Sequence, residues 1–336
     1  MLPMATPGVQ APLLHNKRPV FVVGSPRSGT SLLYHTLLSS GGFAVYDQET
    51  NFFSGLATRV GNLAERRNRE RLIGEWLRSD YFKVEGLNFE ALKQEILCDG
   101  RSSGDFLRIV MENLARSQNV QRWAEKTPDH VLYLQEIKRT LPDALIIHVI
   151  RDGRDVALSL DRIGFLLPYV WSKRSTVMVC GLYWQWMVEV GTKFGATLGR
   201  DYLQVHFEDL VQDPQGTLGN IGKFIDHDLD YARIQQVGIH TVRKPNTSFR
   251  SDFESTNFQP VKRWERYFPE SELAKFESLV GPTLKRFGYR LKTAEKDLPK
   301  TLELRGLRAY YRGYFSFRHW IKSQHFPIVR GLIRDR

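Results

Sequence analysis

Residues 20–31 read VFVVGSPRSGTS, and this stretch decides how the chain is expected to fold. The apolar run at residues 19–24 ends in a glycine-rich turn, and residues 28–39 then place leucines at helical spacing. A buried strand, a tight loop and a helix is the natural interpretation of that order. We therefore expect an α/β protein whose sheet is built outward from this first strand.

Further strands are predicted where short apolar runs end at polar residues, at 43–46, 122–127, 144–150 and 202–207. The run at 144–150 is the clearest, because a continuous apolar, β-branched stretch suits a parallel strand covered on both faces. Helical spacing recurs between the strands, at several places in 53–117 and at 130–140, 152–160, 177–190, 214–225 and 270–287. Strands that alternate with helices predict a P-loop-like, doubly wound, mainly parallel sheet flanked by helices.

The composition is that of a globular protein. Of the 336 residues 42% are hydrophobic, and the two cysteines, Cys98 and Cys180, fit neither a disulfide framework nor a metal-ligand spacing. The first residues lack the pattern of a signal peptide, and the apolar run at 177–190 is interrupted by Gln185 and Glu189. We expect a soluble, cytoplasmic protein with a flexible N-terminus (1–17), one main domain (18–295) and a C-terminal extension (296–336).

The positive charge is concentrated in that extension. The net charge is +11, and residues 300–336 hold nine Lys or Arg and two acids, which leaves +4 for the rest of the chain. Tyrosines, phenylalanines and a tryptophan alternate with these basic residues, as in helices that lie on anionic membranes. Packing of an aromatic face against the main domain explains the pattern equally well. The tail contains no recognised nucleic-acid-binding module, and no feature of the sequence indicates an oligomeric state.

The loop after the first strand has the composition of an anion cradle. Backbone N–H groups of residues 25–30 and the positive end of the following helix favour a bound anion. Its spacing is that of a phosphate loop, but Thr30 stands where such loops carry lysine, and the basic residue is Arg27, inside the loop. A triphosphate would be poorly neutralised here, whereas a smaller terminal anion suits the forked guanidinium of Arg27.

Four segments resemble the sulfotransferases that use 3′-phosphoadenylyl sulfate (PAPS). One of them, VHFEDLVQDP at 205–214, resembles the strand and turn before a late helix of that family. SPRSGTS at 25–31 resembles their 5′-phosphosulfate loop, in the form of the bacterial and tyrosylprotein enzymes. HVIRDGRDVALS at 148–159 resembles their 3′-phosphate element, whose arginine and serine are here Arg151 and Ser159. VKRWE at 261–265 resembles a basic segment that folds over the nucleotide, although Lys262 replaces its glycine. The likeness covers about residues 18–290.

The resemblance implies a set of ligands for the nucleotide. PAPS would be bound by Ser25, Pro26, Arg27, Ser28, Gly29, Thr30, Ser31, Arg151 and Ser159, with Lys262 and Arg263 as weaker candidates. The products would be a sulfated acceptor and adenosine 3′,5′-bisphosphate, and no metal would be required.

The resemblance also implies the catalytic residues. Glu49, in DQETNFF at 47–53, corresponds to the family's general base, and Lys126 and Arg27 would stabilise the leaving group. A solvent-facing loop carboxylate is the alternative for Glu49, an ion pair with Glu125 or Asp129 is the alternative for Lys126, and His130 is the second candidate base.

The acceptor would bear a hydroxyl on a saccharide, a lipid-linked group, a phenol or a tyrosine. Two other functions compete with this one: a P-loop kinase or NTPase of unusual sequence, and a non-catalytic, membrane-associated nucleotide-binding protein.

Overall fold

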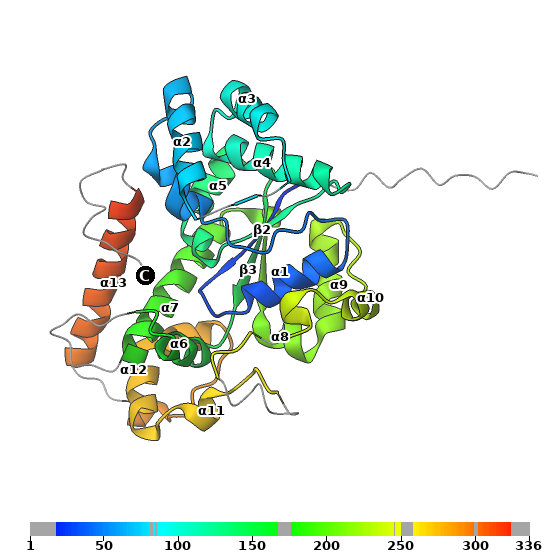
Figure 1. The fold of residues 1–336 in the computed structure, drawn as a ribbon. Helices are drawn as coiled ribbons and strands as arrows, with labels where there is room; N and C mark the ends of the chain where they lie inside the picture. The colour runs from blue at the N-terminus through cyan, green and yellow to red at the C-terminus, as the bar shows by residue number, and fades with distance from the viewer. Residues whose placement is uncertain are drawn as a thin grey trace, which may run out of the picture.

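A parallel β-sheet lies at the centre of the protein, with helices on both of its faces (Figure 1). The computed structural model describes residues 18–80, 83–84, 86–166, 176–244, 246–249, 258–298 and 302–323. Within these ranges the sheet has four strands in the order β2-β1-β3-β4, and every neighbouring pair is parallel. The strands are β1 (Val20–Gly24), β2 (Ala124–Lys126), β3 (Leu145–Ile150) and β4 (Tyr202–His206). The predicted fold class is confirmed.

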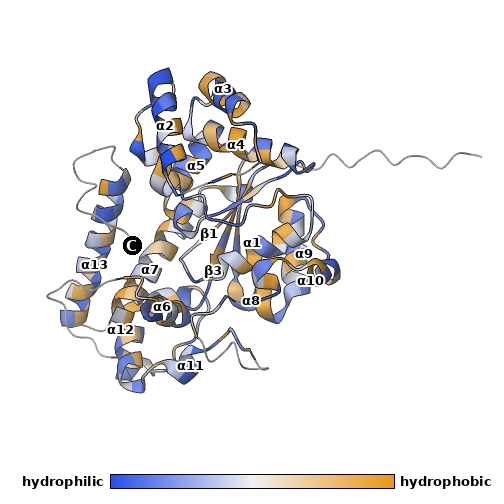
Figure 2. Ribbon diagram, in the orientation of Figure 1, coloured by the Kyte–Doolittle hydropathy of each residue, from blue (hydrophilic) through white to orange (hydrophobic). Residues whose placement is uncertain are grey.

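The alternation of side chains along β1 explains why helices cover both faces. Val20 and Val22 point into one hydrophobic cluster, which contains Leu33 and Leu37, whereas Phe21 and its neighbour Val23 belong to a second, larger cluster. Every residue of β1 and β3 is buried, as the apolar runs in the sequence predict. In Figure 2 hydrophobic residues dominate α7 (Thr176–Gly195), whereas α2 (Arg66–Arg78) is largely hydrophilic.

The remaining helices follow the strands in chain order. They are α1 (Thr30–Ser39), α3 (Phe89–Asp99), α4 (Ser103–Ser117), α5 (Leu134–Thr140), α6 (Gly153–Arg162), α8 (Phe207–Gln212), α9 (Pro214–Ile225), α10 (Tyr231–Val237), α11 (Trp264–Tyr267), α12 (Glu270–Arg286) and α13 (Leu302–Ser323). The short helical turns η1 (Phe52–Leu56), η2 (Ala57–Arg59) and η3 (Pro128–Leu132) border the sheet's carboxyl edge. No helix among the described residues combines the length and the apolar character needed to cross a membrane.

One predicted strand, at residues 43–46, is wrong. This segment forms a single bridge, between Phe43 and Arg122, and does not join the sheet as a strand. Side chains replace strand partners beyond that bridge: the amide of Val45 donates to Gln118, and the carbonyl of Tyr46 accepts from Tyr34. Phe43, Ala44 and Tyr46 are buried without strand pairing beyond the bridge, so hydropathy alone was misleading here.

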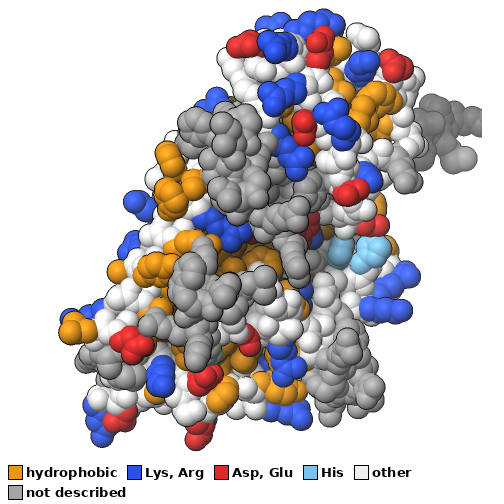
Figure 3. Space-filling model, turned by 60° about the vertical axis from the view of Figure 1, so that its left-hand side comes forward, with side chains coloured by type: hydrophobic (Ala, Val, Ile, Leu, Met, Phe, Trp, Pro, Cys, Tyr) orange, Lys and Arg blue, Asp and Glu red, His pale blue; other side chains and the backbone are white. Residues whose placement is uncertain are grey.

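Helix α13, from the basic C-terminal segment, packs against α7 along its aromatic face. Tyr311 and Phe315 are buried, and the Trp186 indole N–H donates to Ser316 Oγ at 3.2 Å. Phe317 and Trp320 lie on the exposed side of α13. In Figure 3, which brings this side of the molecule forward, hydrophobic and basic side chains lie next to each other on the surface. Contact of this helix with a membrane stays a prediction.

Candidate active site

The loop between β1 and α1 needs glycine at position 29. Gly29 has φ 94°, and a Cβ built on it would lie 2.2 Å from the ring of Phe207. The residue is also the N-cap of α1, and no side chain caps that helix end. Gly29 and the next residues, Thr30 and Ser31, line a cleft. The uncapped amides at the start of α1 therefore border that cleft, where an anion is favoured.

Two loop side chains fit a bound anion. Ser28 is fully buried, and its hydroxyl has no hydrogen-bond partner among the described residues. Arg27 has φ 70°, and its Nε donates to Ser159 Oγ at 2.9 Å. Burial, followed by the positive charge of Arg151, lowers the pKa of Arg27. Two adjacent cations beside an unpartnered buried hydroxyl would both gain from a phosphate or sulfate group.

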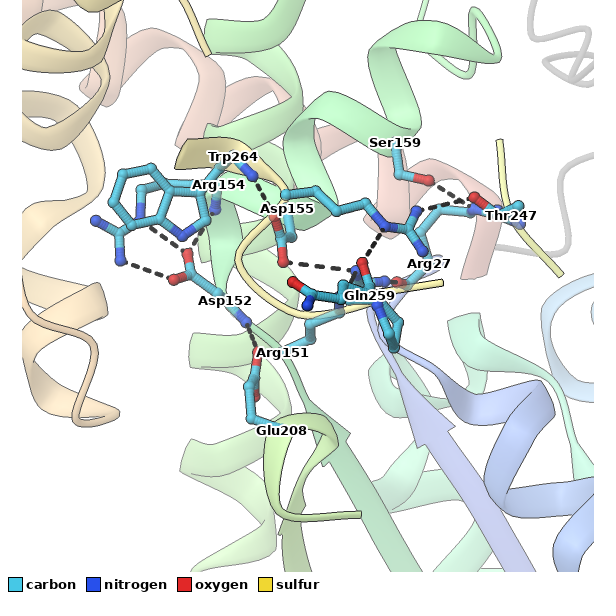
Figure 4. Close-up of polar contacts among 12 residues, drawn as sticks. Arg27, Arg151, Asp152, Arg154, Asp155, Ser159, Glu208, Thr247, Gln259 and Trp264 are labelled. Atoms are coloured by element: carbon cyan, nitrogen blue, oxygen red, sulfur yellow. Dashed lines mark hydrogen bonds and ion pairs between the residues drawn. The ribbon is translucent and has the colours of Figure 1, made fainter. Parts of the chain in front are cut away.

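Arg151 stands at the end of β3 and connects three segments (Figure 4). Its Nη1 donates to the carbonyl of Arg27 at 3.0 Å and its Nη2 to the carbonyl of Pro260 at 2.6 Å. The guanidinium also lies over the Phe207 ring, 4.4 Å from its centroid. The segment between β3 and α6 therefore meets the loop after β1, because β1 and β3 are neighbours in the sheet.

A buried ion-pair network holds the start of α6. Arg154 is 2% exposed, bonds to Asp152 and to Glu277 of α12, both at 2.7 Å, and lies 3.6 Å from the Trp264 ring centroid. The Trp264 amide donates to Asp155 at 2.8 Å, and burial raises the pKa of Asp155 to about 6. The network anchors the segment before Trp264 over the loop. Acidic residues next to Arg154 in sequence were the only signal for it.

The two weaker nucleotide candidates differ in placement. Arg263 lines the cleft and donates to Thr247 Oγ1 at 2.9 Å and to the carbonyl of Gln259 at 3.1 Å. Lys262 is not among the lining residues. Its φ of 58° is a conformation that glycine adopts without strain, so lysine is strained at this position.

Glu49 and Lys126 form an ion pair in the same cleft. Lys126 Nζ donates to Glu49 Oε1 at 2.9 Å, and the lysine side chain is 7% exposed whereas that of the glutamate is 40% exposed. Glu125, one of the alternative partners of the lysine, is buried and accepts hydrogen bonds from Thr50 and Thr127. An acceptor hydroxyl would require a base such as the exposed Glu49 carboxylate. A leaving oxygen would require a cation such as the buried Lys126 ammonium.

His130, the second candidate base, is fully buried away from the cleft lining. Its Nδ1 lies 2.9 Å from Glu125 Oε2, and its Nε2 accepts from the Phe53 amide at 3.2 Å. Both ring nitrogens are therefore engaged in holding the Glu49 segment against β2. The geometry leaves Glu49 as the candidate base.

Most of the candidate residues border one cleft of about 1540 Å³. Of the residues expected to bind the nucleotide, the following line the cleft: Pro26, Arg27, Gly29, Thr30, Ser31, Arg151, Ser159 and Arg263. The two candidate catalytic residues Glu49 and Lys126 line it as well. Ser25 and Ser28 are buried beneath the loop and contribute no lining surface. The carboxyl ends of parallel strands form this edge, which is where ligands bind in open α/β sheets.

Known proteins resemble this chain in sequence and in structure. A sequence model described as the sulfotransferase family matches residues 19–231. The sulfotransferase domain of the Synechococcus PCC 7002 olefin synthase is 21% identical with a TM-score of 0.53, and the match covers 85% of this chain and 100% of that one. The sulfotransferase domain from the curacin biosynthetic pathway is 16% identical (TM-score 0.49; 82% and 99% covered). No curated protein matches the sequence.

The structural likeness shows the fold, and the family model shows the family. Its match spans more than half of the chain and includes the loop, Glu49, Lys126, Arg151 and Ser159. The chain belongs to the sulfotransferase family.

Proposed function

We propose that the protein transfers a sulfuryl group from PAPS to the hydroxyl of an acceptor. The observation that carries this proposal is the bond between Arg27 Nε and Ser159 Oγ, at 2.9 Å. It joins the loop after β1 to the helix after β3, in a cleft that also holds the Glu49–Lys126 pair. A donor with two separated anionic groups, a phosphosulfate and a 3′-phosphate, matches Arg27 and Arg151, two cations that follow the neighbouring strands β1 and β3.

Each part of the donor has residues suited to it. The amides at the start of α1, with Arg27 and the buried Ser28 hydroxyl, would hold the phosphosulfate. Arg151 and Ser159 would hold the 3′-phosphate, and Arg263 would add charge from the opposite side.

The reaction is an in-line displacement at sulfur. The acceptor oxygen forms a bond to sulfur, and the bond from sulfur to the bridging phosphate oxygen breaks and leaves adenosine 3′,5′-bisphosphate. The Glu49 carboxylate takes the acceptor's proton, and Lys126 with Arg27 stabilises negative charge on the departing oxygen. Side chains thus supply the positive charge, and the proposal requires no metal.

Calorimetric titration with adenosine 3′,5′-bisphosphate, with ATP–magnesium in parallel, tests the donor site. We expect micromolar binding of the bisphosphate only, weakened about tenfold or more in Ser159→Ala, because one hydrogen bond to a charged group is lost. Arg312→Ala is the control, since this arginine is 73% exposed on α13.

The outcomes separate the competing functions. Preference for ATP–magnesium would replace the sulfotransferase with a kinase or NTPase. Bisphosphate binding without transfer from PAPS to any acceptor would favour a non-catalytic nucleotide-binding protein.

A further inference from the structure

We propose that the acceptor is an amphiphilic alcohol or phenol with an apolar body, and that helix α13 forms one wall of its binding site. The inference rests on the proposed sulfotransferase function and names the substrate class of the same cleft. Helix α13 lies beyond residues 19–231, so the part of the chain matched by the family model does not include this wall.

The cleft is larger than a nucleotide site alone requires. Its volume of about 1540 Å³ exceeds the roughly 300–1,000 Å³ that is common for pockets holding one small ligand. The loop and β3–α6 residues border one part of it, and α7 and α13 border another. A second ligand can therefore lie beside the donor in a continuous space.

The part bordered by α7 and α13 is aromatic. Its lining includes Phe165, Tyr183, Trp186, Tyr311, Tyr314 and Phe315. The two helices interlock there: the Phe315 ring centroid lies 5.2 Å from that of Tyr183 and 5.6 Å from that of Trp186. This packing places the wall rigidly relative to the sheet.

Two short connections run from the reacting groups to this wall. Lys126 at the end of β2 is followed by Leu132 and Tyr133, which line the cleft, and the Tyr133 ring lies 4.9 Å from that of His319 on α13. On the nucleotide side, Ser159 of α6 is followed by Phe165, whose ring lies 5.8 Å from that of Tyr183. The wall is therefore continuous with the segments that carry Lys126 and Ser159, in one cleft.

The chemistry of the lining selects among acceptors. Ile163 and Phe165 line the cleft, and they are 49% and 42% exposed. Apolar surface is therefore in contact with solvent beside the site. Among the described lining residues at 163–166, 179–186 and 311–322 there is no Asp or Glu. Apart from Gly164 and the basic side chains of Arg318, His319 and Lys322, these residues are aliphatic or aromatic. An apolar body covers such a surface, whereas a saccharide or peptide would leave many of its polar groups unpaired there.

The opposite side of the cleft accepts the polar end. Asn51, Ser54 and Thr58 line it close in sequence to Glu49. The hydroxyl would therefore be directed to Glu49, and the apolar body to α13.

Full-length protein would be titrated with 2-naphthol in the presence and absence of adenosine 3′,5′-bisphosphate. Transfer from PAPS would be measured with 2-naphthol, N-acetylglucosamine and a tyrosine-containing peptide as acceptors. Phe165→Ser and Tyr314→Ser remove wall side chains, and Phe317→Ser, on the exposed side of α13, is the matched control.

We expect saturable 2-naphthol binding, weakened about tenfold in each wall variant and unchanged in the control, because one apolar contact surface is lost. The KM for 2-naphthol should rise by the same factor while the Kd for the bisphosphate stays unchanged. Transfer to the saccharide or peptide alone, or equal effects of the wall and control variants, overturns the inference and leaves the sulfotransferase proposal intact. Binding of 2-naphthol that depends on the wall, without bisphosphate binding, overturns only the donor proposal.

Discussion

The Nε of Arg27 donates a 2.9 Å hydrogen bond to the Oγ of Ser159, a residue 132 positions later in the chain. The two residues meet because β1 and β3 are parallel neighbours, so that the loop after one strand and the helix after the other share an edge of the sheet. Arg151 strengthens this junction through the carbonyl of Arg27. Two segments that are distant in sequence thereby become one binding surface.

Replacing Glu49 with Gln should lower kcat for sulfuryl transfer by about 10²–10⁴-fold, as expected for loss of a general base. Glutamine can still accept the hydrogen bond from Lys126, so the Kd for adenosine 3′,5′-bisphosphate should not change. Steady-state kinetics and calorimetry measure the two effects. Glu75→Gln is the control, because Glu75 also lines the cleft. Equal activity of the two variants would rule out Glu49 as the base.

Gly29→Ala should destabilise the protein by about 2–4 kcal/mol, since it combines an unfavourable positive φ with overpacking against Phe207. Gly41→Ala is matched in backbone conformation, with φ 81° and nothing within 4 Å of the added Cβ, and should cost only about 1–2 kcal/mol. Urea unfolding measures both free energies. Similar losses in the two variants would contradict the close approach of the Phe207 ring.

Arg154→Met should cost about 3–5 kcal/mol of unfolding free energy, because it leaves the buried carboxylates of Asp152 and Glu277 without their cation. Arg139→Met removes an arginine that is 67% exposed and paired with Glu136, and should cost less than about 1 kcal/mol. Thermal and urea unfolding test this difference. A small effect of the first substitution would show that the network adds little to stability.

His148 should make the protein sensitive to acid. Burial, followed by the charge of His206, lowers the pKa of His148 to about 3 in the folded protein. The unfolded chain then binds more protons below pH 6.5, so the folded state loses up to about 1.4 kcal/mol of stability per pH unit from this histidine as the pH falls. The stability difference between wild type and His148→Asn should therefore shift in favour of the variant by about 2–3 kcal/mol between pH 6 and pH 4. A difference that is constant with pH would exclude this origin.

The fold was predictable where local signals agree with tertiary contacts. The loop at 24–31 and the apolar run of β3 each carry a distinct pattern, and both appear in the structure as expected. Residues 43–46 share the apolar character of a strand, yet they are bridged to Arg122 at a single point. Hydropathy reports burial, and burial without pairing gives no strand.

The location of a candidate site residue was predictable where that residue lies at or just after the end of a strand. Arg27, Arg151 and Lys126 each do so, and all three line the cleft. The network around Arg154 and the engagement of both His130 nitrogens were not visible, because their partners come from distant elements.

By itself, the sequence determined that residues 20–31 form a strand, an anion-binding type of loop and a helix, because glycine spacing and apolar periodicity act within one short segment. Only the tertiary structure decided that Lys126 pairs with Glu49, 77 positions away, and that the basic C-terminal helix lays its aromatic face on α7. The first contact depends on the order of the strands in the sheet, and the second depends on which face of α7 the other helices leave uncovered. Both are settled by the packing of the whole chain and not by any local pattern.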